Sequence, residues 1–396
     1  MPPLTLLRNA RIYSPDPRGP GDVLIGGGTV LALGLAGGVA LPELPPALCS
    51  VVDLQGARLI PGLVDSHVHV TGGGGESGPA SRVPRVVLSA LTRAGITTCV
   101  GVLGTDGTTR TVAELVASTL ALRAEGISAY CWTGSYEVPP ITLTSSVRSD
   151  LVFVDPILGV GEVAISDHRS SQPTRDEIAR LAADCHVAGL MTGKAGILHL
   201  HLGNGARGLS MIHELLDHTE LPARTFHPTH VNRRKALFED AVALARRGST
   251  IDVTAFPVDE GEDAWSAPDS IVRYLESGAP AERLTCSSDG GGCLPQYDAQ
   301  GSLLSIDIGK PGAVSEALAD LLARGRALED VLPVFTSNVA DALRFRQKGR
   351  IEVGHDADLL VLDDAHQVHH VIARGRVVVR SKEAQVLGSF EQARSS

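Results

Sequence analysis

Residues 58–70, RLIPGLVDSHVHV, form an apolar run ending in alternating histidines, and residues 81–95, SRVPRVVLSALTRAG, follow with the spacing of an amphipathic helix. The same order recurs at ILHLHLG (197–203) and LSMIHELLDHT (209–219). KALFEDAVALARRG (235–248) precedes the run STIDVTA (249–255), and GAVSEALADLLARG (312–325) adds another helical stretch. Eight strand–helix units need about 250 residues, so this alternation over residues 57–346 predicts a TIM-like (β/α)8 barrel.

Both ends of the chain have a different pattern. Short β-like runs separated by glycine and proline, such as DVLIGGGTVLALG (22–34) and HHVIARGRVVVRS (369–381), indicate hairpins with little helix. We therefore expect residues 1–56 and 347–396 to build one small β-sandwich domain beside a catalytic barrel of residues 57–346. A doubly wound open sheet is the competing architecture, but its GxGxxG fingerprint does not occur near the first strand.

Composition limits the partners that this chain can have. Its 396 residues carry a formal charge of −10, with no cluster of Lys or Arg, which argues against nucleic acid and anionic membranes and favours a small-molecule substrate. No apolar run reaches membrane-spanning length, and the start lacks the pattern of a signal peptide. Six cysteines without a CxxC pair or a disulfide framework fit a reducing compartment, so we expect a cytoplasmic protein.

Polar side chains follow several of the predicted strands. His67 and His69 are two residues apart, so on a strand both imidazoles face the same side and can reach one ion. Further candidates end later runs, two of them with a local rival: His201 or His199, His230 or His227, and Asp289. Because loops at the carboxyl ends of barrel strands converge on one mouth, we expect these side chains to meet there.

Imidazole and carboxylate together are typical ligands of Zn(II) and its first-row neighbours. A bound ion of this kind lowers the pKa of water from 15.7 to about 7 and so provides hydroxide at neutral pH. No GxSxG elbow, phosphate-binding loop or catalytic-cysteine signature competes with this reading. The pattern predicts a hydrolytic metal site.

The chain resembles the amidohydrolase superfamily in its beginning, PGLVDSHVH (61–69), in the order of the ligand candidates, and in its close, GHDADLLVLD (354–363) with ARGRVV (373–378). More narrowly, it resembles isoaspartyl (β-aspartyl) dipeptidases. Five local motifs carry that likeness: HVHVTGGGGESGP (67–79), TGSYEVP (133–139), AISDHRSSQP (164–173), PTHVNRR (228–234) and SSDGGG (287–292).

The resemblance implies two metal ions, usually zinc, at the barrel mouth. His67 and His69 would hold the more buried ion, and His201 and His230 the outer one. Asp289 would lie near the bridging hydroxide, take its proton and pass it to the leaving amine.

The resemblance also implies how the substrate is held. Tyr136 would polarise the scissile carbonyl, Glu76 would receive the free ammonium group, and Arg169 and Arg233 would hold carboxylate. Thr105 and Gly74 match positions at the aspartyl end. A β-aspartyl dipeptide carries one ammonium and two carboxylates, so one carboxylate and two forked guanidinium groups are complementary to it.

Two positions depart from the family pattern. Glu162 stands where a carboxylated lysine usually bridges the two ions, and its side chain is several bonds shorter. We expect Glu162 to be a ligand, which requires the strand to move inward, a water to extend the bridge, or only one ion to bind. Cys293 replaces a serine that contacts the aspartyl carboxylate, and a thiol is a weak donor.

Two other functions remain open on the sequence. One is another amidohydrolase activity, on a cyclic amide, an N-acyl amino acid or a deaminase substrate. A cyclic-amide enzyme would have no evident use for the full set of Glu76, Tyr136, Arg169 and Arg233. A catalytically silent relative would typically have lost metal ligands, which this chain retains. The resemblance further implies a homo-oligomer, an octamer built from dimers.

Overall fold

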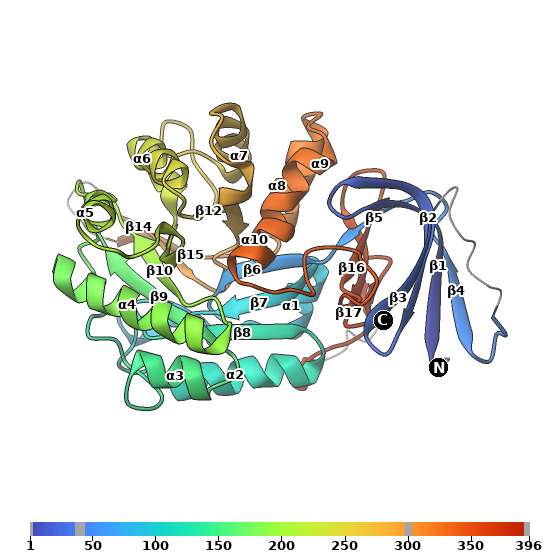
Figure 1. Ribbon diagram of the computed structural model, residues 1–396, viewed down its shortest axis with the longest axis horizontal. Helices are drawn as coiled ribbons and strands as arrows, with labels where there is room; N and C mark the ends of the chain where they lie inside the picture. The colour runs from blue at the N-terminus through green and yellow to red at the C-terminus, as the bar shows by residue number, and fades with distance from the viewer. Residues whose placement is uncertain (1–2, 36–43, 298–302, 392–396) are drawn as a thin grey trace.

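A computed structural model describes residues 3–35, 44–297 and 303–391 of the protein. The larger of its two parts is built around parallel strands (Figure 1). In chain order they are β6 (Leu63–Val68), β7 (Ile96–Gly101), β8 (Ser128–Thr133), β9 (Ile157–Ile165), β10 (Ile197–Leu202), β11 (Phe226–Thr229), β12 (Ile251–Thr254) and β13 (Leu284–Ser287). Strands β6 to β11 pair in that order, and β12 pairs with β13. β12 lies beside β11, and a parallel bridge between Val68 and Gly290 joins β6 to the chain after β13. The strands thus surround one interior.

Helices surround these strands (Figure 1). They are α1 (Leu88–Arg93), α2 (Val112–Glu125), α3 (Val147–Phe153), α4 (Arg175–Thr192), α5 (Ser210–His218), α6 (Lys235–Arg246), α7 (Ala267–Glu276), α8 (Ala313–Ala323), α9 (Leu328–Val331) and α10 (Ser337–Ala342). Single 3-10 turns are η1 (Pro79–Ser81), η2 (Ala223–Thr225), η3 (Val231–Arg233), η4 (Ala281–Arg283) and η5 (Leu332–Phe335). Helix α4 shows why such stretches begin and end where they do. Thr174 and Glu177 form a capping box at its start, and Gly193 ends it in the left-handed conformation.

A second, mostly antiparallel sheet is built from both ends of the chain. Its strands are β1 (Leu4–Tyr13), β2 (Pro17–Gly26), β3 (Thr29–Leu35), β4 (Cys49–Asp53), β5 (Arg58–Pro61), β16 (Leu359–Leu362), β17 (Val368–Ala373), β18 (Arg376–Arg380) and β19 (Glu383–Ala384). β5 pairs with β16 and so joins the two halves. Buried apolar side chains from both halves, among them Ile12, Val23 and Leu359, form a core separate from that of the barrel. The predicted fold class is confirmed, and the domain limits at residues 56 and 347 stay a prediction.

Two smaller features complete the fold. A hairpin of β14 (Cys293–Tyr297) and β15 (Leu303–Ile308) follows β13. Behind the barrel, the buried ammonium of Lys348 lies 2.6 Å from Asp356 and 2.7 Å from Asp358, just before β16 begins. None of the described helices is long and apolar enough to cross a membrane. All six cysteines lie in described segments as free thiols.

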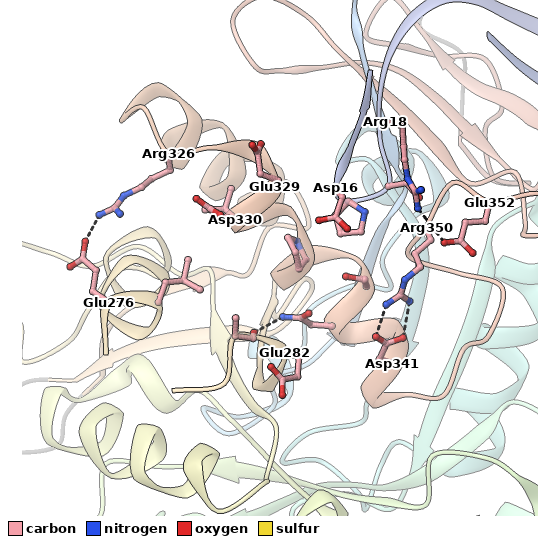
Figure 2. A pocket seen from close by; sticks show the side chains of 18 residues that line it. Asp16, Arg18, Glu276, Glu282, Arg326, Glu329, Asp330, Asp341, Arg350 and Glu352 are labelled. Carbon is pink, nitrogen blue, oxygen red and sulfur yellow. Dashed lines mark hydrogen bonds and ion pairs between the residues drawn. The ribbon is translucent and has the colours of Figure 1, made fainter. Parts of the chain in front are cut away.

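A cavity of about 720 Å³, here called the junction cavity, lies where the terminal sheet meets the barrel (Figure 2). Glu282 in its lining precedes β13, so this cavity is at the amino ends of the strands. Its charged groups pair with each other at the surface: Arg350 donates to both oxygens of Asp341 at 2.8 and 2.7 Å. Arg18 lies 3.7 Å from Glu352.

Candidate active site

His67, in β6, and His69, just after it, lie beside Asp289, which follows β13. Nε2 of His67 and Nε2 of His69 are 3.5 and 3.0 Å from Oδ1 of Asp289. The same two nitrogens are 3.4 and 3.5 Å from Oε1 of Glu162, on β9. Three separate strands therefore bring imidazole and carboxylate together at the carboxyl end of the barrel.

A second pair of histidines faces the other oxygen of the same glutamate. Nδ1 of His201, on β10, is 3.0 Å from Oε2 of Glu162, and Nε2 of His230 is 3.4 Å from it. His230 follows β11 in the left-handed conformation, and its Nδ1 is 2.7 Å from the hydroxyl of Thr254. One carboxylate thus lies between the two histidine pairs, with one oxygen toward each.

An irregularity in strand pairing explains how so short a side chain reaches both pairs. Val160 pairs with Leu198, but Val163 pairs with Leu200. Two residues of β9 therefore lie opposite His199 alone, which is a β-bulge that redirects the strand. The extra residue is Gly161, where a Cβ atom would come within 2.7 Å of the Cβ of His199. A glycine at this position lets the backbone approach β10 closely enough to carry Glu162 into the site.

Three buried atoms of this cluster have no hydrogen-bond partner among the described residues: Nε2 of His67, Oε1 of Glu162 and Oδ1 of Asp289. Nε2 of His67 is 3.4 Å from the Glu162 oxygen and 3.5 Å from the Asp289 oxygen, yet it forms a hydrogen bond with neither. Leaving buried polar atoms unpaired is costly, and a cation among them would satisfy all three. Two overlapping groups could each hold a metal ion: His67, His69 and Glu162, and Glu162, His201 and His230. The donor set fits divalent metal.

The protonation states follow from burial and the close charges. Burial alone would raise the pKa of Glu162, but His67, together with hydrogen bonds from His201 and His230, holds it well below its ordinary value. Burial alone would likewise raise the pKa of Asp289, but the imidazole of His69, 3.0 Å away, lowers it to about 2. Both carboxylates are therefore ionised at neutral pH. Burial lowers the pKa of His67, but the charge of Glu162 outweighs it and raises the value to about 9. His67 therefore holds a proton on a nitrogen that a metal ion would have to displace in order to bind there.

A cavity of about 730 Å³, here called the mouth cavity, opens above the cluster. Its lining includes every predicted site residue except His67, which is fully buried beneath it. The structure therefore brings together residues that lie up to about 220 positions apart in the chain. Lys194 is the lysine nearest to Glu162 in the sequence. Its ammonium does not take part in the cluster, since it donates to the backbone oxygens of Leu151 and Val154.

Glu76 lies at one side of the mouth cavity. Its Oε1 accepts hydrogen bonds from the hydroxyl of Thr105 at 3.0 Å and from Arg169 at 3.3 Å, while its Oε2 is buried without a partner in the part of the chain that the structure describes. The glycine run before it is held by the buried guanidinium of Arg110, which donates to the carbonyl oxygens of Gly73 and Gly74. This fixed loop leaves one carboxylate oxygen available to a cationic group.

Two guanidinium groups and a phenol surround His201. Arg169 and Arg233 each lie 3.3 Å from its Nε2, and the Tyr136 hydroxyl is 2.8 Å from its Nδ1. Asp167 accepts from Arg169 at 3.1 and 2.8 Å and lies 2.9 Å from His201, so it orients both. Burial raises the pKa of Tyr136 well above its ordinary value, which keeps the phenol protonated.

Cys293 and Gly74 are neighbours in the cavity lining. A Cβ atom at Gly74, whose φ is +76°, would come within 3.3 Å of the Cys293 Cβ. Burial raises the pKa of the Cys293 thiol to about 11, so this position offers a neutral S–H at pH 7.

Several lining residues have no counterpart among the sequence predictions. The loop after β12 contributes Phe256, Asp259 and Glu262, and the β14–β15 hairpin contributes Leu294 and Asp307. The signal that could have found the loop is its position, because it follows a barrel strand at the carboxyl end.

The amidohydrolase family model matches residues 58–378, which cover the barrel and part of the terminal sheet. The chain belongs to the amidohydrolase family. Within this family it groups with the β-aspartyl dipeptidases, as the sequence predicts. The crystal structure of the β-aspartyl dipeptidase of Fervidobacterium islandicum AW-1 in complex with the β-Asp-Leu dipeptide is 40% identical. It covers 99% of this chain and 100% of that chain, with a TM-score of 0.91. The prediction of a hydrolytic enzyme of the dipeptidase group is confirmed.

More distant amidohydrolases share less with this enzyme. The dihydropyrimidinase of Brevibacillus agri NCHU1002 has a TM-score of 0.65 at 16% identity over 97% of each chain, which shows the fold alone. Among curated proteins, adenine deaminase 2 of Agrobacterium fabrum is 26% identical over 90% of this chain. The chain spans about half the length of that relative, 56% of it.

Proposed function

We propose that this amidohydrolase hydrolyses the isopeptide bond of β-aspartyl dipeptides in a metal-dependent reaction. The observation that carries the proposal is that Glu76, whose buried Oε2 has no hydrogen-bond partner among the described residues, lines the same cavity as Arg169, Arg233 and the histidine–carboxylate cluster. This charge pattern is complementary to one ammonium, two carboxylates and an amide between them.

We propose that this cluster holds two Zn(II) ions per chain. His67 and His69 would hold one, His201 and His230 the other, and Glu162 would bridge them, with Asp289 as a further ligand. When bound, such ions act as Lewis acids and lower the pKa of water from 15.7 to about 7.

The substrate is held at both ends in this proposal. Glu76 receives the α-ammonium of the isoaspartyl residue through Oε2, the oxygen to which none of the described residues donates. Gly74, Thr105 and Cys293 line the aspartyl end. Arg169 and Arg233 donate to the substrate carboxylate.

Two residues act on the scissile amide. Asp289, ionised at neutral pH, accepts the proton of the attacking water at a carboxylate oxygen and delivers it to the nitrogen as the C–N bond breaks. The protonated phenol of Tyr136 donates to the carbonyl oxygen as negative charge develops on it. The products are free aspartate and the second amino acid.

Incubation of the zinc-loaded protein with β-Asp-Leu, α-Asp-Leu, a hydantoin and adenine tests this proposal. We expect release of leucine from β-Asp-Leu alone, measured by amine detection. In a Glu76→Gln variant, KM should rise because the neutral amide no longer balances the ammonium. Preferential cleavage of α-Asp-Leu or the hydantoin, or release of ammonia from adenine, would contradict the proposal.

The proposal also covers the cellular location and the oligomeric state of the enzyme. We infer that the enzyme works in the cytoplasm, because its six unpaired cysteines suit a reducing compartment. We also infer a homo-oligomer, an octamer built from dimers, by analogy with the family that the sequence resembles. Light scattering coupled to size exclusion would measure the latter.

A further inference from the structure

A row of buried polar side chains runs from His67 into the barrel interior, away from the mouth cavity. Nδ1 of His67 lies 2.8 Å from Nε2 of His199, and Nδ1 of His199 lies 3.0 Å from Nδ1 of His227. Nε2 of His227 is 3.2 Å from the hydroxyl of Thr285, which donates to Asp252 at 2.7 Å. We call these residues behind His67 the relay: His199, His227, Thr285 and Asp252.

The relay is wholly inside the protein. All four of its side chains are at most 1% exposed, and none lines the mouth cavity. His199 stacks on Trp132, with ring centroids 5.1 Å apart and planes at 17°. Branched apolar side chains usually fill the interior of such barrels, and buried polar groups are costly unless fully paired. Packing alone therefore does not account for two histidines and an aspartate here.

The contacts allow one consistent direction for the hydrogen bonds of the relay. If Nε2 of His67 is the ligand atom, its N–H is on Nδ1 and donates to His199 Nε2. His199 then carries its own N–H on Nδ1, directed at His227, whose Nδ1 and backbone oxygen both accept at 3.0 and 3.1 Å. His227 donates through Nε2 to Thr285.

The last acceptor is a carboxylate. Asp252 also accepts from the hydroxyls of Thr229 and Ser287 at 2.7 and 2.6 Å. Every donor thus points away from the mouth and toward one negative charge. Metal-binding histidines usually donate their second N–H to a carboxylate or carbonyl, which sets the tautomer and increases ligand basicity. Here that carboxylate is three side chains away.

We propose that His199 and His227 are positioning residues that fix His67 in the tautomer and orientation required for metal binding, with Asp252 as the anchor. The proposal rests on the metal site of the proposed function. It assigns the two histidines that compete with His201 and His230 in the sequence to a separate task.

Metal affinity tests the relay without relying on catalysis. We expect a His199→Phe variant to bind Zn(II) about 10–100-fold more weakly in a chelator competition, because His67 loses its acceptor. The visible absorption bands of the Co(II)-substituted protein should also change. A His199→Gln variant can accept from His67 and donate to His227, so it should recover most of the affinity and the wild-type spectrum.

A second pair of variants separates the relay from general packing. Thr285→Val keeps the side-chain shape but removes the acceptor of His227, far from the ligand atoms, and should also weaken Zn(II) binding. Thr119→Val is the matched control, because Thr119 is an equally buried hydroxyl on α2 that donates to the backbone oxygen of Leu115 and is not part of the relay. Its affinity and spectrum should equal those of the wild type.

The outcomes are distinguishable. Wild-type Zn(II) affinity and Co(II) spectrum in both His199→Phe and Thr285→Val would overturn the relay while leaving the metal site intact. Equal weakening in Thr285→Val and Thr119→Val would also overturn it, because packing would then be the cause. Absence of Zn(II) binding by the wild-type protein would overturn the metal site and the relay together.

Discussion

The mouth cavity and the junction cavity have nearly equal volumes, about 730 and 720 Å³, and both are rich in acidic side chains. They differ in how those acids are satisfied. At the junction, Asp341 is 57% exposed and pairs with Arg350 (Figure 2). At the mouth, Glu162 is 1% exposed and one of its oxygens has no hydrogen-bond partner in the segments that the structure describes. Burial combined with unsatisfied ligand atoms, rather than the number of charges, therefore distinguishes a chemical site from a solvated surface.

The largest effect should come from removing the carboxylate shared by the two histidine pairs. A Glu162→Ala variant should lose metal and lower kcat by roughly 10³-fold or more, because Lewis-acid stabilisation of several kcal/mol disappears with the ions. Elemental analysis of protein purified without chelator should give nearly two ions per wild-type chain and fewer in the variant.

Glu276→Ala at the junction cavity is the control, since that side chain is 60% exposed and pairs with Arg326 at the surface. It should keep full metal content and activity. If the Glu162→Ala protein still bound two ions per chain, Glu162 would not be a metal ligand, and the buried carboxylate would not distinguish the mouth cavity from the junction cavity.

A smaller effect should follow from breaking a buried ion cluster that has no role at the mouth. Lys348→Met should destabilise the protein by roughly 3–5 kcal/mol, because Asp358 would stay buried without its cation. Urea unfolding measures this. Lys382→Met is the control, since it breaks an exposed pair with Asp363 in the same terminal part of the chain.

The same cluster predicts a pH dependence. Burial alone lowers the pKa of Lys348, but Asp358 and Asp356 raise it above the ordinary value of 10.5. Its contribution to stability is therefore fully present below pH 10.5 and is lost as pH rises through the folded-state pKa. Unfolding free energies of wild type and Lys348→Met should converge at strongly alkaline pH, and a constant difference would contradict this assignment.

The smallest effect should come from the junction cavity itself. Arg350→Met removes a bidentate pair with Asp341, yet the pair is solvated, so the free energy of unfolding should fall by about 1 kcal/mol or less. Dipeptide hydrolysis should be unchanged. A large loss of activity in this variant would mean that the two ends of the barrel are coupled.

The sequence predicts the barrel and the strand ends that face one another, because both follow from local periodicity and from the convergence of carboxyl-end loops. It cannot choose between His199 and His201. Both point into the interior from the same face of β10 and differ only in their height along the strand, which depends on packing against β9. The bulge at Gly161 is likewise a property of two paired strands, so the reach of Glu162 could not be read from one segment.

The loop after β12 was missed for a different reason. The run from Pro257 to Trp265 contains acids and glycine, which are common in any solvated loop, and only its attachment to a barrel strand brings it to the cavity. The structure shows that the residues at the mouth lie close together. The roles assigned to them remain predictions.

The bulge that carries Glu162 has a consequence for how the enzyme matures. A glutamate is ready as soon as the chain has been translated, whereas a carbamate must first form from lysine and dissolved carbon dioxide. Apoprotein refolded in degassed, bicarbonate-free buffer should therefore regain zinc as completely as in bicarbonate, which would make its assembly independent of the gas composition of the habitat.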